Sequence, residues 1–370
     1  MTANECELCG PGRRRFFTGL AALAAGSLVG MPSGNAQTQT GASGASVIAP
    51  GRDWIDVHHH LVPPGYMSQV PSDDAVPGAS ATPRRALDNW TVAHSIEQMD
   101  QAGVATSILS ISNPGIWFGD NEKARKLARE CNEYGAKLVS AYPGRFGLFA
   151  ALPLPDVEGS LREIAYALDV LKADGIGLYT SYGNKWLGDP AFDPVFAELN
   201  RRKAIVYTHP TTADCCRNLQ AAVSPNVVEY QTDTTRAIAE ILASGTASRY
   251  PDMRIIFSHA GGTMPFLIER FAGWAKSPQI AKNLPKGLKC ELERFYYDTA
   301  QTSNSVAMGA LTKVVPDSQI LFGTDYPFRT VVEHVKNLTE CGVFDDKRLR
   351  EIGRGNALAL LPRFRTRASS

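Results

Sequence analysis

The sequence has almost no excess of charge of either sign. It carries 38 Lys and Arg residues against 37 Asp and Glu residues, which gives a formal net charge of +1. No cluster of basic residues occurs outside the N-terminal segment. Proteins that bind nucleic acid generally show a basic patch or stripe, so nucleic acid is not an expected partner.

Hydrophobic runs long enough to span a membrane are also absent. The apolar run at residues 20–31 has about 12 residues, too few to cross a hydrocarbon core of ~30 Å. It follows a twin-arginine pattern at residues 13–17 and precedes the small residues Gly34-Asn35-Ala36. We therefore expect a signal peptide over residues 1–36 rather than a membrane anchor, and a periplasmic location after export. Residues 37–52, rich in Gly, Ser, Ala and Thr, are expected to form a flexible arm.

A disulfide framework is not expected either, although the chain has seven cysteines. Cys6 and Cys9 lie in the expected signal peptide, which leaves an odd number in the mature chain, two of them adjacent in sequence. Most of the five are expected to be buried apolar residues. They are Cys131, Cys215, Cys216, Cys290 and Cys341.

What the sequence does contain is a repeated alternation of short β-branched or aromatic runs with longer helical patterns. Eight such runs predict a single (β/α)8 TIM barrel over residues 53–365. The expected strands are 54–61, 106–112, 146–154, 175–182, 204–210, 254–261, 295–300 and 320–328. The clearest helical patterns are 92–103, 121–141, 157–173, 232–249 and 331–341.

One segment interrupts this alternation. Residues 62–91 contain five prolines and no strand-like pattern. A long irregular insertion after a barrel strand usually lies over the mouth of the active site. We expect this one, after the first strand, to act as a cap or binding loop.

Four potential metal ligands fall at the C-terminal ends of expected strands: His58, His60, His209 and Asp325. In a parallel barrel these ends meet on one face, where catalytic groups gather. Side chains alternate along a strand, so His58 and His60 point to the same face about 6.6 Å apart, while the intervening His59 points toward the helices. Three imidazoles and one carboxylate are a ligand set that Zn²⁺ accepts, with Mn²⁺ as an alternative.

His259 is a fifth polar residue at a strand end. It could be a further metal ligand or a group that transfers a proton beside the metal. Because four other ligands are present, we favour the acid/base role. His94 and His334 lie in expected helices and are interpreted as solvated or edge-packed.

Two absences narrow the chemistry of such a site. The fourth strand has no lysine before Lys185, so the carboxylated lysine that bridges two metals in some barrel hydrolases is missing. His209 is followed by Pro-Thr-Thr-Ala, without the glutamate that purine deaminases place there. The pattern therefore predicts one metal ion and neither of these two activities.

Several longer motifs resemble those of one branch of the amidohydrolase superfamily, the branch of aminocarboxymuconate-semialdehyde, 6-methylsalicylate and γ-resorcylate decarboxylases. The resemblance extends over residues 54–362. The motifs are His58-x-His60 with Pro63, Met99-Asp100-x-x-Gly103-Val104, residues 143–148, Ser258-His259-Ala260-Gly261-Gly262, residues 295–300 and residues 321–328.

The resemblance implies roles for individual residues. His58, His60, His209 and Asp325 match metal ligands, and His259 matches the histidine that handles a proton. Arg270 matches an arginine that family dimers lend to the neighbouring active site to bind a substrate carboxylate. Trp186 matches an aromatic residue of the pocket. Arg85, or its neighbour Arg84, matches a second carboxylate-binding arginine.

The expected function is non-oxidative decarboxylation of an aromatic or unsaturated carboxylic acid by a metal-dependent homodimer. Protonation of the carbon that bears the carboxylate would release carbon dioxide, with no redox cofactor. The alternative is hydrolysis of a lactone, ester or amide, in which Asp325 and the metal would activate water. A non-enzymatic binding protein is disfavoured because the ligand set lies at the catalytic face.

Overall fold

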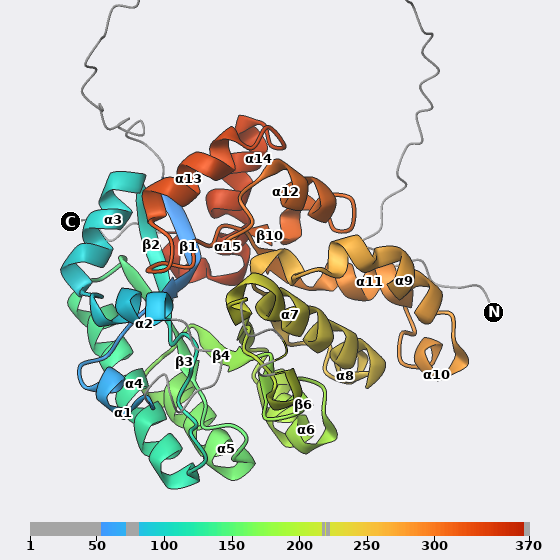
Figure 1. Cartoon of the computed structure of the whole chain (residues 1–370), viewed down its shortest axis with the longest axis horizontal. Coiled ribbons are helices and arrows are strands. Elements are labelled where there is room, and N and C mark those ends of the chain that lie inside the picture. The colour runs from blue at the N-terminus through green and yellow to red at the C-terminus, as the bar shows by residue number, and fades with distance from the viewer. Residues whose placement is uncertain (1–52, 72–80, 217–218, 220–222, 366–370) are drawn as a thin grey trace, which may run out of the picture. The chain divides into compact units, whose positions relative to one another are not determined.

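The computed structural model describes residues 53–71, 81–216, 219 and 223–365. Eight parallel strands form one sheet in the order β1-β2-β3-β4-β7-β8-β9-β10. Backbone hydrogen bonds from Val57 N to Phe322 O (3.0 Å) and from His60 N to Tyr326 O (2.9 Å) join β1 to the chain around and after β10. The sheet thereby approaches a closed barrel, as Figure 1 shows. The strands are β1 (Trp54–His60), β2 (Val104–Ser110), β3 (Phe146–Ala151), β4 (Gly175–Tyr179), β7 (Ile205–His209), β8 (Arg254–Phe257), β9 (Tyr296–Asp298) and β10 (Ile320–Leu321).

Helices surround the strands in the (β/α)8 arrangement that the sequence predicted (Figure 1). They are α1 (Tyr66–Gln69), α2 (Ala81–Asp88), α3 (Val92–Ala102), α4 (Asn121–Ala141), α5 (Val157–Ala165), α6 (Asp193–Arg201), α7 (Pro225–Ala243), α8 (Thr246–Arg249), α9 (Ile268–Trp274), α10 (Pro278–Ala281), α11 (Gly287–Arg294), α12 (Ser305–Leu311), α13 (Val331–Glu340), α14 (Asp346–Arg350) and α15 (Asn356–Leu360). Within the described ranges, no helix is both long and apolar enough to cross a membrane.

Several helices begin where a side chain can accept a hydrogen bond from a free backbone N–H of the first turn. Asp120 accepts from Glu122 and Lys123 at the start of α4, and Asp156 accepts from Gly159 at the start of α5. The expected helix at 157–173 is shorter than the pattern suggested. It continues past α5 only as the π-helix η2 (Tyr166–Val170).

The expected helix at 232–249 also differs in its bounds. It starts earlier, at Pro225, and Gly245 divides it into α7 and α8. Gly245 has a φ of 75°, a left-handed conformation that glycine adopts without steric cost and that ends a helix.

The core has two parts. A smaller cluster includes alternate residues of β1 and β7, among them Ile55, Val57, Ile205 and Tyr207, closed off by residues of α15 and the chain after it. A larger cluster packs the outer faces of the strands against the helices. Since alternate residues of a strand point to opposite faces, both clusters draw on the same strands.

The segment at residues 62–91 is more regular than its prolines suggested. Its described parts form the short helices α1 and α2. Pro83 lies in the first turn of α2, where a missing backbone N–H costs no intrahelical bond. The expected signal peptide and arm at residues 1–52 lie outside the described residues, and both remain predictions.

Candidate active site

Four side chains converge at the C-terminal ends of the barrel strands. His58 and His60 come from β1, His209 ends β7, and Asp325 lies in the chain after β10. One ligand atom from each falls within 4.8 Å of the others, and all four residues are buried. The Oδ1 atom of Asp325 is 3.0 Å from His60 Nε2 and 3.1 Å from His58 Nε2. The four residues singled out in the sequence therefore form one cluster.

The outer nitrogen of each imidazole faces a group that accepts a hydrogen bond. His58 Nδ1 lies 2.8 Å from Asp298 Oδ2, His60 Nδ1 lies 3.3 Å from Ser110 O, and His209 Nδ1 lies 2.9 Å from Pro210 O. Carboxylate and carbonyl oxygens only accept, so each Nδ1 carries the hydrogen. The three inner Nε2 atoms are then left with lone pairs directed at one point beside the Asp325 carboxylate.

The electrostatics of the cluster favour a positive charge at that point. Burial lowers the pKa of His60 to about 3 and that of His209 to about 4, which keeps both rings neutral. Burial also lowers the pKa of His58, but Asp298 and Asp325 outweigh it and raise that pKa to about 10. The two carboxylates thus favour a positive charge beside His58, either a proton on its Nε2 or a bound cation.

A divalent cation can take the place of that proton. The Nε2 atom of His209 is buried and has no hydrogen-bond partner among the described residues, although a buried polar atom normally has one. Three neutral imidazole nitrogens and one carboxylate oxygen match the ligands of Zn²⁺ and are accepted by other divalent transition metals. The residues present therefore fit the expected metal.

The turn that carries Asp325 is shaped by its neighbours. Asp325 has a φ of 68°, a sparsely populated conformation that aspartate tolerates better than most residues. Thr324 Oγ1 donates to the buried carboxylate of Asp56 at 2.6 Å. A Cβ atom on Gly323 would lie 2.8 Å from His58 Cβ and 3.0 Å from Asp298 Cβ. Only glycine at 323 lets the turn come this close to β1 and β9.

Replacing Gly323 by Ala should therefore weaken both metal binding and folding. The added methyl group must push His58 and Asp298 apart, and overpacking of this kind costs about 1–3 kcal/mol. We expect a lower metal affinity by titration and a lower melting temperature. Gly309→Ala is the matched control, since nothing lies within 4 Å of the corresponding Cβ position. Unchanged metal affinity in Gly323→Ala would show that the close approach is not required.

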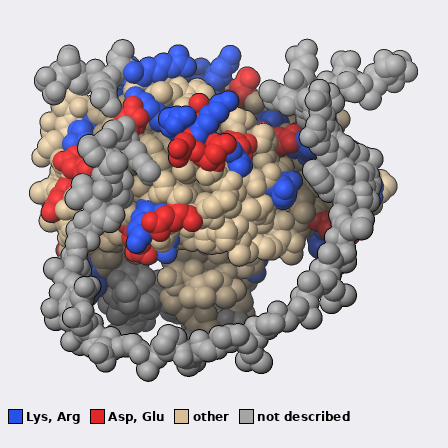
Figure 2. All heavy atoms as spheres, turned by 90° about the horizontal axis from the view of Figure 1, so that it is seen from above, with Lys and Arg blue, Asp and Glu red and all other residues tan. Residues whose placement is uncertain are grey.

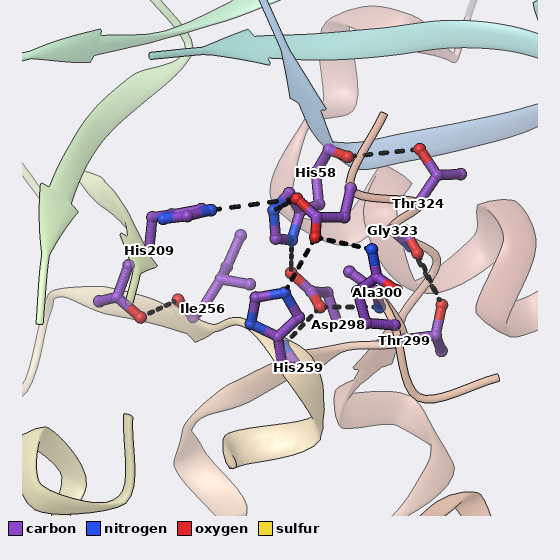
Figure 3. A network of polar contacts seen from close by, with 12 residues as sticks. His58, His209, Ile256, His259, Asp298, Thr299, Ala300, Gly323 and Thr324 are labelled. Carbon is purple, nitrogen blue, oxygen red and sulfur yellow. Dashed lines mark hydrogen bonds and ion pairs between the residues drawn. The ribbon is translucent and has the colours of Figure 1, made fainter. Parts of the chain in front are cut away.

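His259 lies beside the cluster, in the 3-10 turn η5 (His259–Gly261) after β8. Its backbone N–H donates to Asp298 Oδ1 at 2.8 Å, and its Nε2 is 3.4 Å from Asp325 Oδ2. Its Nδ1 is buried and has no partner among the residues that the structure describes. Figure 3 shows its ring facing the side chains of His58 and Asp298. This position suits a group that moves a proton next to the cation.

Asp298 contacts both His58, a member of the four-residue cluster, and His259 beside it. One carboxylate oxygen accepts from His58 Nδ1, and the other accepts the backbone N–H groups of His259 and Ala300 (Figure 3). Such a carboxylate fixes the orientation of a metal-binding histidine and raises its basicity. Asp298 therefore positions both a candidate metal ligand, His58, and the candidate proton-transfer residue, His259.

The three residues expected to contact substrate are not members of the four-residue cluster. Trp186 lies in the hairpin of β5 (Ser181–Tyr182) and β6 (Lys185–Trp186), and its indole N–H donates to Asp233 Oδ1 at 2.6 Å. Arg85 is exposed on α2, and Arg270 is exposed on α9. The alternative, Arg84, donates instead to the backbone oxygens of Pro71 and Met67. A contact of these residues with substrate remains a prediction.

Other residues near the cluster were not foreseen from the sequence. Gln301, after β9, donates from Nε2 to Asp325 Oδ2 at 3.0 Å. The Phe328 ring is centred 5.7 Å from that of His60, and the Tyr230 ring is centred 6.5 Å from that of His209. Gln301 directly follows the recognised motif at residues 295–300, and Phe328 ends the motif at residues 321–328, whereas Tyr230 lies in no recognised motif.

The interpretation of the two helical histidines was wrong for one of them. His94 is exposed, as expected. His334 is fully buried, and its Nε2 lies 3.1 Å from Thr299 Oγ1. The same Thr299 Oγ1 donates to Gly323 O and accepts from the backbone N–H of Gly323. The buried His334 therefore supports the turn that leads to Asp325.

A Ser-His-Asp arrangement exists but is sealed from solvent. His59 Nδ1 lies 3.0 Å from Asp56 Oδ2, and His59 Nε2 lies 2.7 Å from Ser95 Oγ on α3. His59 thus points toward a helix, as its place between His58 and His60 predicted. All three residues are 0% exposed, so no substrate can reach Ser95 and the arrangement is structural.

Several known proteins are similar to this chain. The amidohydrolase family profile matches residues 55–363. Decarboxylase yanB of Aspergillus niger is 37% identical over 329 residues, covering 84% of this chain and 88% of that protein. The 6-methylsalicylic acid decarboxylase of Penicillium expansum is 36% identical over 322 residues, covering 84% and 97%.

A solved structure shares the fold at low sequence identity. It is 5-carboxyvanillate decarboxylase of Novosphingobium aromaticivorans, in complex with manganese and 4-hydroxy-3-methoxy-5-nitrobenzoic acid. The TM-score is 0.75 at 20% identity, over 84% of this chain and 96% of that chain.

Proposed function

The chain belongs to the amidohydrolase family, and we propose that it is a metal-dependent, non-oxidative decarboxylase of an aromatic carboxylic acid. The observation that carries the proposal is the cluster of three imidazole lone pairs and one carboxylate with His259 beside it. The names of two relatives, which are decarboxylases, support the same reaction. His58, His60, His209 and Asp325 would hold the cation, with Zn²⁺ or Mn²⁺ as candidates.

The chain's own residues supply the proton. When bound, a divalent cation supplies a fixed positive charge and Lewis acidity next to the substrate oxygens. His259 donates a proton to the ring carbon that carries the carboxylate, so that a C–H bond forms from a π electron pair of the ring. The bond to the carboxylate then breaks, its electron pair restores the aromatic ring, and carbon dioxide leaves. His259 regains a proton from solvent, so the reaction needs no oxidant or reductant.

Product analysis tests this proposal directly. Purified protein loaded with Zn²⁺ or Mn²⁺ is incubated with a panel of hydroxybenzoates and muconate-type acids, and carbon dioxide release is measured. Decarboxylation gives carbon dioxide and a product that has lost its carboxyl group. The hydrolase alternative predicts a new carboxylic acid from a lactone, ester or amide and no carbon dioxide.

We also propose that the active form is a homodimer in which Arg270 binds the substrate carboxylate in the partner's site. Arg270 follows two exposed apolar side chains, Phe266 at 64% and Leu267 at 40% exposed. Contiguous exposed apolar patches often mark protein–protein interfaces. A guanidinium offers a carboxylate two parallel donors that lysine lacks.

Subunit mixing tests the shared site. Arg270→Ala and His259→Ala should each be nearly inactive as homodimers. In a mixed dimer one of the two sites has both residues intact, so mixing should restore part of the activity. Each variant refolded with itself is the control. No recovery, when labelled subunits demonstrably exchange, would contradict the shared site.

A nucleic-acid partner is not proposed for this protein. On the face seen in Figure 2, basic and acidic side chains are interspersed rather than gathered by sign. A small-molecule carboxylic acid is the proposed substrate.

Export to the periplasm is proposed from residues 1–36 alone. The twin-arginine pattern and the small residues before Ala36 support it. Expression of the full chain in a bacterium with this export route should give a periplasmic protein whose N-terminus is Gln37. A cytoplasmic protein that retains residues 1–36 would contradict the assignment.

A further inference from the structure

The two carboxylate oxygens of Asp325 have different surroundings. Oδ1 lies 3.0 Å from His60 Nε2 and 3.1 Å from His58 Nε2, on the side of the candidate metal ligands. Oδ2 lies 3.0 Å from Gln301 Nε2 and 3.4 Å from His259 Nε2. The carboxylate therefore presents one oxygen to the imidazoles of the cluster and the other to Gln301 and His259.

The contact with Asp325 fixes the direction of the Gln301 amide. An ionised carboxylate only accepts hydrogen bonds, and an amide side chain donates only through its nitrogen. Nε2 rather than Oε1 of Gln301 must therefore face Asp325. Because Gln301 donates to Oδ2 and the His259 ring lies beside the same oxygen, Oδ1 is the oxygen left to bind a cation at the imidazoles.

Gln301 occupies a backbone position that glutamine rarely takes. Its φ is 54°, in the left-handed region that residues other than glycine seldom adopt. The backbone N–H of Thr302 donates to Thr299 O at 3.0 Å, so Gln301 is the third residue of a turn. A third residue with positive φ is usually Gly or Asn. Residues held in such conformations gather at functional sites, and here the glutamine carries a side chain that reaches Asp325.

Neighbouring residues hold this turn in place. The backbone N–H of Ala300 donates to Asp298 Oδ1 at 3.0 Å, at the end of β9. Thr299 Oγ1 donates to Gly323 O at 3.1 Å, a bond that Figure 3 shows. The turn is thus tied both to β9 and to the chain that leads to Asp325. The amide of residue 301 therefore starts from a fixed point relative to the carboxylate.

We propose that Gln301 is a positioning residue whose amide holds Oδ2 of Asp325, so that the carboxylate binds the cation through Oδ1 alone. The inference rests on the proposed set of metal ligands. A hydrogen bond to a metal-binding carboxylate fixes its orientation, and loss of such a partner typically lowers metal affinity or activity about 10-fold to 100-fold. Without the amide, the carboxylate can rotate and bring both oxygens to the cation.

Two variants separate the amide from the backbone of the turn. Methionine has about the length of glutamine and no branch at Cβ, so Gln301→Met keeps the backbone cost and removes the donor. Gln301→Gly removes the whole side chain and relieves the left-handed conformation. The Zn²⁺ affinity, measured by chelator competition, should fall about 10-fold to 100-fold in both variants.

A matched control and a spectrum make the result specific. Gln101→Met is the control, because Gln101 is exposed on α3 and also donates to a carboxylate, Glu97 Oε1, at 3.2 Å. It should keep the wild-type affinity. At saturating Co²⁺, the visible absorption spectrum of both Gln301 variants should differ from that of the wild type, because the spectrum depends on the number and arrangement of the ligands.

The outcomes separate this inference from the metal site on which it rests. If both Gln301 variants keep the wild-type affinity and spectrum while Asp325→Asn loses the metal, Gln301 has no positioning role and the ligand set stands. If Gln301→Gly alone keeps the wild-type affinity, or if affinity falls with an unchanged spectrum, Gln301 acts only through the turn and the proposal is wrong. If the wild type binds neither Zn²⁺ nor Co²⁺, the ligand set and the role of Gln301 are both overturned.

Discussion

Asp325→Asn and His209→Ala should each remove the bound cation or lower its affinity at least ~10-fold, and activity should be lost with it. Asp325 provides the only carboxylate in the four-residue cluster, and its Oδ1 lies within 3.1 Å of two imidazole nitrogens. Burial raises its pKa, but His58 and the other imidazoles around it lower the pKa well below its usual value. Asparagine keeps the shape of this side chain and removes its charge.

The His209 variant tests the contribution of a ligand from β7, whereas His58 and His60 lie on β1. Its Nδ1 hydrogen is already used by Pro210 O, so its Nε2 lone pair has no other role among the described residues. Metal content by atomic emission and affinity by chelator competition provide the measurements. His94→Ala is the matched control, because His94 is an exposed histidine on α3. Stoichiometric metal at undiminished affinity in either ligand variant would contradict the assigned set.

Replacing His259 should have a different effect, namely a loss of about 10²-fold to 10⁴-fold in rate with the metal retained. His259 Nε2 is 3.4 Å from Asp325 Oδ2, beside the cluster rather than within the four-residue set. The backbone N–H of residue 259, which bonds Asp298, survives any substitution except proline. The support that Asp298 gives to His58 should therefore remain.

His259→Asn is the better variant for this test, with His259→Ala beside it. The φ of residue 259 is 53°, and asparagine tolerates this left-handed conformation better than alanine. Agreement between the two variants separates the loss of a proton donor from backbone strain. If the metal is lost with the side chain in both variants, His259 is a ligand and the assignment of proton transfer to it is wrong.

The four-residue cluster could be predicted from the sequence because its members lie at the C-terminal ends of expected strands. A parallel barrel brings these ends together on one face. His58 and His60 lie two residues apart on one strand, and their Nε2 atoms meet at 3.2 Å. His209 and Asp325 follow other strands at the same end of the barrel, so the parallel arrangement brings them together.

Contacts made by loops could not be predicted in this way. Gln301 reaches Asp325 from an irregular segment, where no periodicity relates sequence to direction. Trp186 was placed by resemblance alone, and its bond to Asp233 depends on the hairpin β5–β6, which the alternation pattern did not separate from β4. His334 was misjudged because a helical pattern gives the buried face but not the depth of burial.

For Tyr207 the sequence predicts the direction of the side chain but not its contacts. It lies two residues before His209, so alternation along β7 places its ring on the same inner face. The sequence therefore contained a signal for its direction. It contained none for the lack of a hydrogen-bond partner among the described residues, because that depends on groups that are distant in sequence.

The most direct measurement is the reaction of the metal-loaded protein with an aromatic acid in deuterium oxide, followed by NMR of the product and quantification of carbon dioxide. If the carbon that loses the carboxylate is protonated in the reaction, each molecule of carbon dioxide is matched by one deuterium at that carbon and none at any other carbon of the product. A new carboxylic acid without carbon dioxide, or carbon dioxide without deuterium at that carbon, would contradict the proposed function.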